Sequence, residues 1–140
     1  MRRWLRRDTA WVPTVPPKQR FWIVLLLFAT PFVAGVDFLM GENTESLSLV
    51  ERSMPAPAWG ALLVCAGTAM VYGYADRRPK LCIGGLHLAG ALFLTIAAGI
   101  GWNTIDAHGS FRGPWIYTLV GACLWIKAVG YAQQIRQVPR

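Results

Sequence analysis

The sequence predicts an all-α integral membrane protein with four transmembrane helices and both chain ends in the cytoplasm. Of its 140 residues, 54% are hydrophobic and only 15% are charged, whereas soluble domains average about 25% charged residues. The apolar residues form long blocks that are apolar on every side, as lipid-facing helices are. The charged residues, with a net charge of +7, gather in short segments between these blocks. This distribution excludes a disordered chain, a coiled coil and an ordinary soluble domain.

Four apolar blocks are long enough to cross a bilayer, because about 20 helical residues span roughly 30 Å of hydrocarbon. The predicted transmembrane helices are residues 21–40, 58–75, 81–102 and 114–132. The remaining segments include a basic arm over residues 1–20 and a tail over residues 133–140, and none is long enough for a separate soluble domain. We therefore expect one membrane domain over residues 21–132.

Each predicted helix is almost free of acidic, basic and histidine residues. The first carries only Asp37, near its end, and the second carries none. The third carries only His87, and the fourth carries only Lys127. A charge inside hydrocarbon costs a few kcal/mol unless it is paired or hydrated, so such long uncharged stretches are typical of lipid-embedded helices.

The basic residues predict the orientation of the chain. Eleven of the 14 Lys and Arg residues lie on the side that holds both chain ends in this topology, and only Arg52 and Arg112 lie in the opposite loops. Because short basic loops stay in the cytoplasm, both ends are expected there.

The same basic residues predict contact with the lipid bilayer, because they flank the spans instead of forming a folded basic face. Anionic lipid headgroups, and not nucleic acid, are therefore the expected binding partners. The residues expected to contact these headgroups are Arg2, Arg3, Arg6, Arg7, Arg77, Arg78 and Lys80. Residues 2–10 are expected to form either a short helix on the membrane surface or a disordered cytoplasmic arm.

Three polar residues inside the predicted spans are candidates for function. His87 and Lys127 each lie about six residues from the cytoplasmic face, which places them about 9 Å deep. They either form a polar patch that lines a water path or a proton site, or they are structural. In the structural case Lys127 extends its ammonium to the headgroups and neutral His87 bonds a neighbouring helix. Asp37 is expected to be hydrated or paired with Arg52 or Arg112.

Two rows of small residues, spaced four apart, are candidates for helix packing. In the second span the row is Ala61, Cys65, Ala69 and Gly73, and in the third it is Ala91, Thr95 and Gly99. Small residues let helix backbones approach closely, which is the main source of attraction between helices in lipid. We expect these rows to form contacts within one copy or between copies.

The sequence contains no arrangement that is typical of catalysis. It lacks the common nucleophile, zinc and phosphate-binding motifs. Its three cysteines, Cys65, Cys82 and Cys123, fall in separate spans and behave as small apolar residues. We therefore expect no enzymatic activity, no cofactor and no metal site.

The overall layout resembles the small four-span membrane proteins that phages of actinobacteria encode. The shared features are the basic arm MRRWLRRDTAWVPTVPP, four short spans, a DRRPK inner loop and a brief basic tail. The resemblance implies a holin-like role in the bacterial cytoplasmic (inner) membrane, where many copies gather and permeabilise or remodel it. The tail has only two basic residues, fewer than holin tails often show.

Two other functions remain open from the sequence. The first is an accessory or scaffolding subunit of a larger membrane complex, because a small chain without catalytic groups suits that role equally well. The second is a small channel or proton-coupled carrier that uses His87, Lys127 and Asp37.

Overall fold

The computed structural model describes residues 17–40, 52–106 and 110–137, and these ranges contain helices, turns and no strand. The long helices within these ranges are α1 (Pro17–Met40), α3 (Ala56–Ala75), α4 (Pro79–Asp106) and α5 (Arg112–Gln137). This architecture confirms that the described part of the chain is all-helical. Each helix contains one of the predicted spans and begins before it; α4 and α5 also extend beyond their predicted ends.

Three of these helices, α3, α4 and α5, are long and apolar enough to cross a membrane. Helix α1 has 24 residues, but its described apolar stretch, Leu25–Met40, is shorter than the other three. The helix begins at Pro17, so the end of the predicted arm belongs to the helix. Proline suits a first helical position because its missing N–H has no partner there in any case.

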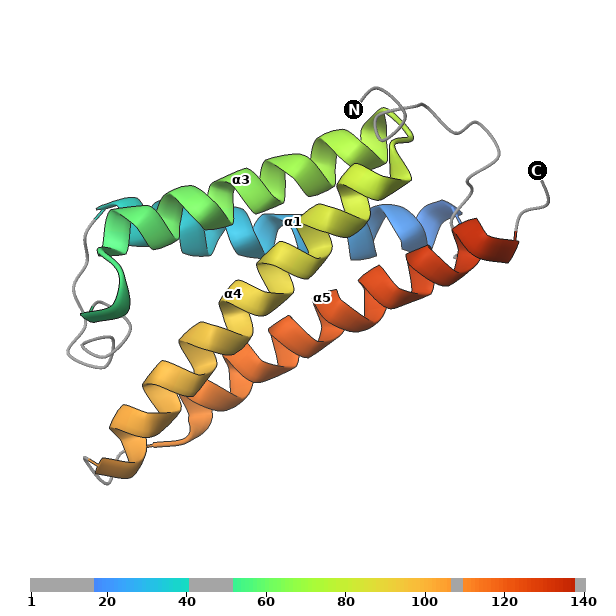
Figure 1. The fold of residues 1–140 in the computed structure, drawn as a ribbon. Coiled ribbons are helices and arrows are strands. Elements are labelled where there is room, and N and C mark those ends of the chain that lie inside the picture. The colour runs from blue at the N-terminus through green and yellow to red at the C-terminus, as the bar shows by residue number, and fades with distance from the viewer. Residues whose placement is uncertain (1–16, 41–51, 107–109, 138–140) are drawn as a thin grey trace.

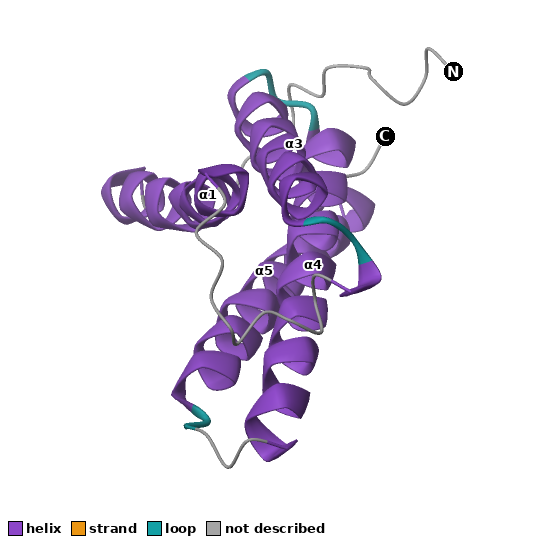
Figure 2. Ribbon diagram, turned by 90° about the vertical axis from the view of Figure 1, so that its left-hand side faces the viewer, coloured by secondary structure: helices purple, strands orange, loops and turns teal. Residues whose placement is uncertain are grey.

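The helices form two antiparallel hairpins that cross each other. Helix α1 packs on α3, and α4 packs on α5, while α3 and α4 join the two hairpins. Figure 1 shows the two hairpins running at an angle to each other, and Figure 2 shows α1 set to one side of α3. The start of α1, the α3–α4 turn and the end of α5 lie at the same end of the molecule (Figure 1). An antiparallel arrangement of four helices requires this placement.

The chain changes direction between α3 and α4 within a few residues, and backbone hydrogen bonds close the end of α3. The N–H of Arg78 donates to the carbonyl of Gly73 at 2.7 Å, and the N–H of Arg77 donates to the carbonyl of Tyr74 at 3.3 Å. Arg77 has a φ of 51°, the left-handed conformation that usually requires glycine at this position. Pro79 then begins α4, where its fixed φ suits the first helical turn.

Glycines lie at the closest approaches between the helices. A Cβ atom at Gly60 would lie 2.6 Å from the carbonyl oxygen of Gly35, where α1 meets α3. A Cβ atom at Gly121 would lie 3.0 Å from the carbonyl oxygen of Gly90, where α4 meets α5. The backbones are therefore in direct contact, which increases the dispersion energy available to helices in lipid.

Candidate functional site

The small-residue row of α3 turns from the surface into the interior along the helix. Ala61 and Cys65 are exposed, Ala69 is half-buried, and Gly73 is buried against the backbone of Cys82 at the start of α4. A step of four residues advances 400° around a helix of 3.6 residues per turn, so each step rotates the row by about 40°. Of this row, Gly73 therefore lies in a close contact within the chain, while Ala61 and Cys65 face outwards.

The corresponding row of α4 lies mostly near the surface. Thr95 is exposed, and Ala91 and Gly99 are half-buried. The hydroxyl of Thr95 donates to the carbonyl of Ala91 at 2.9 Å, so its polar group is satisfied within the helix.

The close contacts of α4 fall on Gly85 and Gly90, which the four-residue spacing did not select. A Cβ atom at Gly85 would lie 2.8 Å from the carbonyl oxygen of Ala66 on α3. The presence of glycine could have indicated these positions in the sequence, because Ala, Cys and Thr keep backbones further apart than glycine does.

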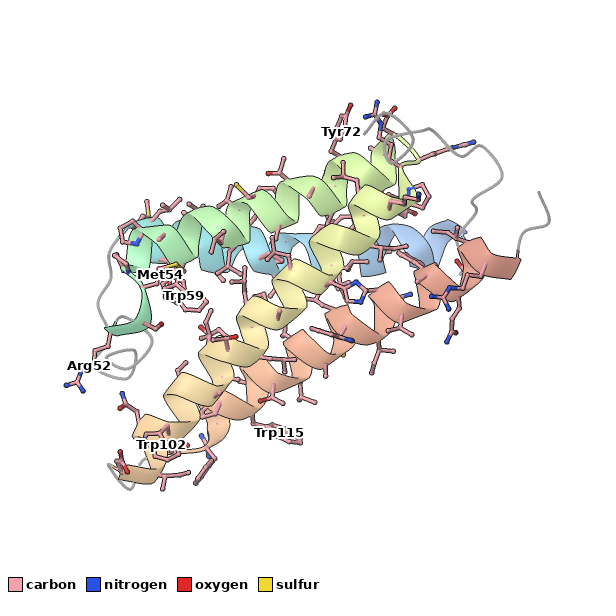
Figure 3. All side chains as sticks on the ribbon, viewed as in Figure 1. Arg52, Met54, Trp59, Tyr72, Trp102 and Trp115 are labelled. Carbon is pink, nitrogen blue, oxygen red and sulfur yellow. The ribbon has the colours of Figure 1, made fainter. Side chains whose placement is uncertain are left out.

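The outward surface of α3 presents both small and large side chains to the surroundings, and we refer to it as the α3 face. It consists of exposed residues, namely Ala61, Leu62, Cys65, Thr68, Val71 and Tyr72. The hydroxyl of Thr68 donates to the carbonyl of Val64 at 2.8 Å, so it needs no partner outside the helix. Figure 3 shows Tyr72 at the end of α3 that adjoins the α3–α4 turn. On this face Ala61, Cys65 and Thr68 have small side chains, and the hydroxyl of Thr68 is satisfied within the helix.

The structure gives His87 and Lys127 different partners. The Nδ1 atom of His87 lies 3.0 Å from the carbonyl oxygen of Ile83, one turn earlier on its own helix. Its ring meets the ring of Trp125 on α5 edge to face, with centroids 5.1 Å apart. The expected bond from His87 to a neighbouring helix is thus a ring contact instead. His87 therefore packs against α5 through the ring of Trp125.

Lys127 directs its ammonium along its own helix towards the end of α5. The Nζ atom lies 5.6 Å from the ring centroid of Tyr131, one turn closer to that end. An aromatic face attracts a cation and reduces the cost of removing it from water. This direction is the one expected of a lysine that reaches towards the headgroups.

Asp37 is exposed on α1. Within the described ranges it forms no ion pair with Arg52 or Arg112, contrary to one of the two expectations. An ion pair within these ranges joins Arg78 and Asp76 in the α3–α4 turn. The other expectation, a hydrated Asp37, agrees with its exposure.

The basic residues of the α3–α4 turn differ in how far they are available to an anionic headgroup. The Nε atom of Arg78 lies 2.5 Å from Oδ2 of Asp76, and its guanidinium lies over the ring of Tyr72 at 5.3 Å. Much of the charge of Arg78 is therefore already matched by Asp76. Arg77 and Lys80 are both exposed, and Lys80 also interacts within the chain. The other predicted headgroup contacts (Arg2, Arg3, Arg6 and Arg7), with the expected surface helix over residues 2–10, lie outside the described residues.

Neither the structure nor the comparisons assign a catalytic centre. Among the described residues, no group of three or more His, Cys, Asp or Glu lies close enough to hold a metal ion. No protein-family model, curated protein or solved structure matches this chain. The described surfaces of the helices are therefore the basis for a functional proposal.

Proposed function

We propose that this protein spans the bacterial cytoplasmic membrane four times and assembles side by side with copies of itself, thereby permeabilising or remodelling that membrane as holins do. In this proposal α1 supplies the fourth span and both chain ends lie in the cytoplasm. The apolar part of α1, residues 21–40, supports this reading. At about 1.5 Å per residue its roughly 20 residues extend about 30 Å, which matches the roughly 30 Å of hydrocarbon.

The α3 face is the observation that carries the proposal. Inside the chain, helix backbones come very close together at glycines such as Gly60 and Gly85. The α3 face offers small residues, although larger ones than glycine, at Ala61 and Cys65, which are directed away from the rest of the chain. In lipid, helix association depends on close packing and not on the exclusion of water, so such a surface favours contact with another span.

Inducible expression in a bacterium tests the function directly. With a fluorescent reporter of membrane potential, we expect the potential to collapse abruptly once the protein accumulates, because many copies must gather before a lesion opens. A control protein that inserts into the same membrane, with a similar size and number of spans, should leave the membrane potential unchanged. Cells that keep both potential and growth at high expression would contradict the proposal.

The native Cys65 can report contacts between copies of the protein. A variant in which Cys65 is the only cysteine, made by Cys82→Ala and Cys123→Ala, is expected to form disulfide-linked dimers in oxidised membranes. Such a bond requires the two Cα atoms to approach within about 7 Å. The product is measured by non-reducing electrophoresis.

The matched control is the variant that keeps only Cys123, which is exposed on α5. We expect this variant to remain monomeric under the same oxidation. Equal cross-linking at both positions would indicate random collision, and an absence of dimers at Cys65 would exclude the α3 face as a close contact.

The α3 face also fits a span of an unlike protein, which is the arrangement of an accessory or scaffolding subunit. Purification in mild detergent distinguishes the two functions: a homo-oligomer alone favours the first, and a stoichiometric unlike partner favours the second. A channel or carrier built on His87, Lys127 and Asp37 finds less support, because His87 bonds Ile83 and the ammonium of Lys127 lies over Tyr131.

A further inference from the structure

A groove opens between α4 and α5 at the end of this hairpin that lies away from the α3–α4 turn. Its volume is about 500 Å³, within the range of about 300–1,000 Å³ that is typical of sites for small molecules. Figure 3 shows Trp115, one of its lining residues, beside the start of α5. The principal lining residues are Gly101, Ile105, Phe111, Arg112, Pro114 and Trp115.

The lining of the groove is apolar and faces outwards. The exposed fractions of Ile105, Phe111 and Trp115 are 60%, 60% and 62%. Thr118 also lines the groove, but its hydroxyl donates to the carbonyl of Pro114 at 2.8 Å and is thereby satisfied. Aromatic residues near the ends of transmembrane helices lie at the level of the lipid headgroups. The groove therefore presents apolar surface where the hydrocarbon of a bilayer begins.

One cation borders this apolar groove. Arg112, the first residue of α5, is exposed, and within the described ranges its guanidinium forms no ion pair. A guanidinium binds a phosphate through two parallel hydrogen bonds and is less strongly hydrated than an ammonium. A phospholipid carries an acyl chain and a phosphodiester in one molecule. The groove offers an apolar surface for such a chain and, beside it, a cation that binds phosphate.

We propose that this groove binds an anionic phospholipid, with its phosphodiester on Arg112 and an acyl chain between Ile105 and Trp115. The inference rests on the membrane placement in the proposed function. In that topology the residues of the groove lie at the non-cytoplasmic face, so the lipid belongs to the outer leaflet. An anionic headgroup is favoured because no acidic side chain is among the lining residues to neutralise Arg112.

Photochemical labelling of the full-length protein tests the site. The protein is reconstituted into phosphatidylcholine vesicles that contain a small fraction of phosphatidylglycerol with a photoreactive acyl chain, and labelled peptides are identified by mass spectrometry. We expect labelling to concentrate on the peptides that contain residues 101–105 and 111–118. Unlabelled phosphatidylglycerol should reduce this labelling more than the same amount of added phosphatidylcholine.

Two variants and one matched control test whether the labelling depends on the groove and on Arg112. Arg112→Gln removes the cation, and Gly101→Leu fills the groove; both are expected to lower labelling of these peptides several-fold. A Cβ atom at Gly101 meets only the Cβ of Pro114, at 3.7 Å, so the helix tolerates the new side chain. Gly84→Leu places the same side chain in open space near the other end of α4 and should leave labelling unchanged.

Flotation of the vesicles separates the two ways in which the inference can fail. If the protein does not float with the vesicles and withstand alkaline extraction, the membrane placement itself is wrong. If it floats but labelling is spread evenly along the chain, or is equal in wild type, Arg112→Gln and Gly101→Leu, the lipid site is wrong and the membrane placement stands.

Discussion

Replacing Gly85 with valine is expected to separate α3 from α4 and to lower the stability of the protein more than a valine at the adjacent Gly84. A Cβ atom at Gly85 would lie 2.8 Å from both the carbonyl oxygen of Ala66 and the backbone nitrogen of Met70. These are backbone atoms, so relief requires movement of a whole helix. Overpacking of this kind typically costs about 1–3 kcal/mol.

Gly84→Val is the matched control because it places the same side chain one residue earlier on the same helix. A Cβ atom at Gly84 meets nothing within 4 Å. The intrinsic effect of valine on the helix is therefore common to both variants, and the difference between them reports the α3–α4 contact.

Thermal unfolding in mild detergent, followed by the fraction of protein that remains monodisperse on size exclusion, measures this difference. We expect the midpoint of Gly85→Val to fall below that of Gly84→Val by on the order of 5 °C or more. Equal midpoints would show that the two hairpins do not meet at Gly85.

Replacing Cys65 with phenylalanine is expected to delay or abolish the collapse of membrane potential that we propose for the wild type. Cys65 is exposed in the middle of the α3 face, so the larger ring fits the single copy but holds a second copy away. A loss of about 1.4 kcal/mol at each contact weakens that contact about tenfold. An assembly of many copies multiplies this effect.

Cys123→Phe is the control, since it introduces the same ring at an exposed position of α5. Both variants are expressed to equal levels in the membrane, and the time from induction to depolarisation is compared. A Cys65→Phe variant that depolarises as early as Cys123→Phe would show that the α3 face has no part in the activity.

Most of the glycines at helix contacts could not be predicted from the sequence. Gly73 belonged to a row that the sequence singled out, but Gly60, Gly85, Gly90 and Gly121 did not. A regular spacing identifies residues that share one side of a helix, and any side can face a neighbour or lipid. Which side meets a partner depends on how the hairpins cross, and that is a property of the whole assembly.

The polar residues within the apolar helices show the same limit. Their positions along each helix follow from the sequence, but the partner of each side chain does not. His87 meets Trp125 because α4 and α5 pack with Gly90 against Gly121, and Lys127 lies on a different side of α5 from Trp125. A polar patch that joins His87 to Lys127 stays a prediction, because the structure shows only the ring of Trp125 beside His87 and the ring of Tyr131 beside Lys127.

Composition and spacing alone determined that the described chain is helical and that α3, α4 and α5 are suited to lipid, because every backbone polar group in hydrocarbon must be satisfied within a helix. The approximate helix positions follow from the same requirement. Only the tertiary structure decided which surfaces are internal and which, such as the α3 face and the groove beside Arg112, face outwards. Helices that are apolar all round carry no polar side to mark the exterior, so packing between backbones makes that choice.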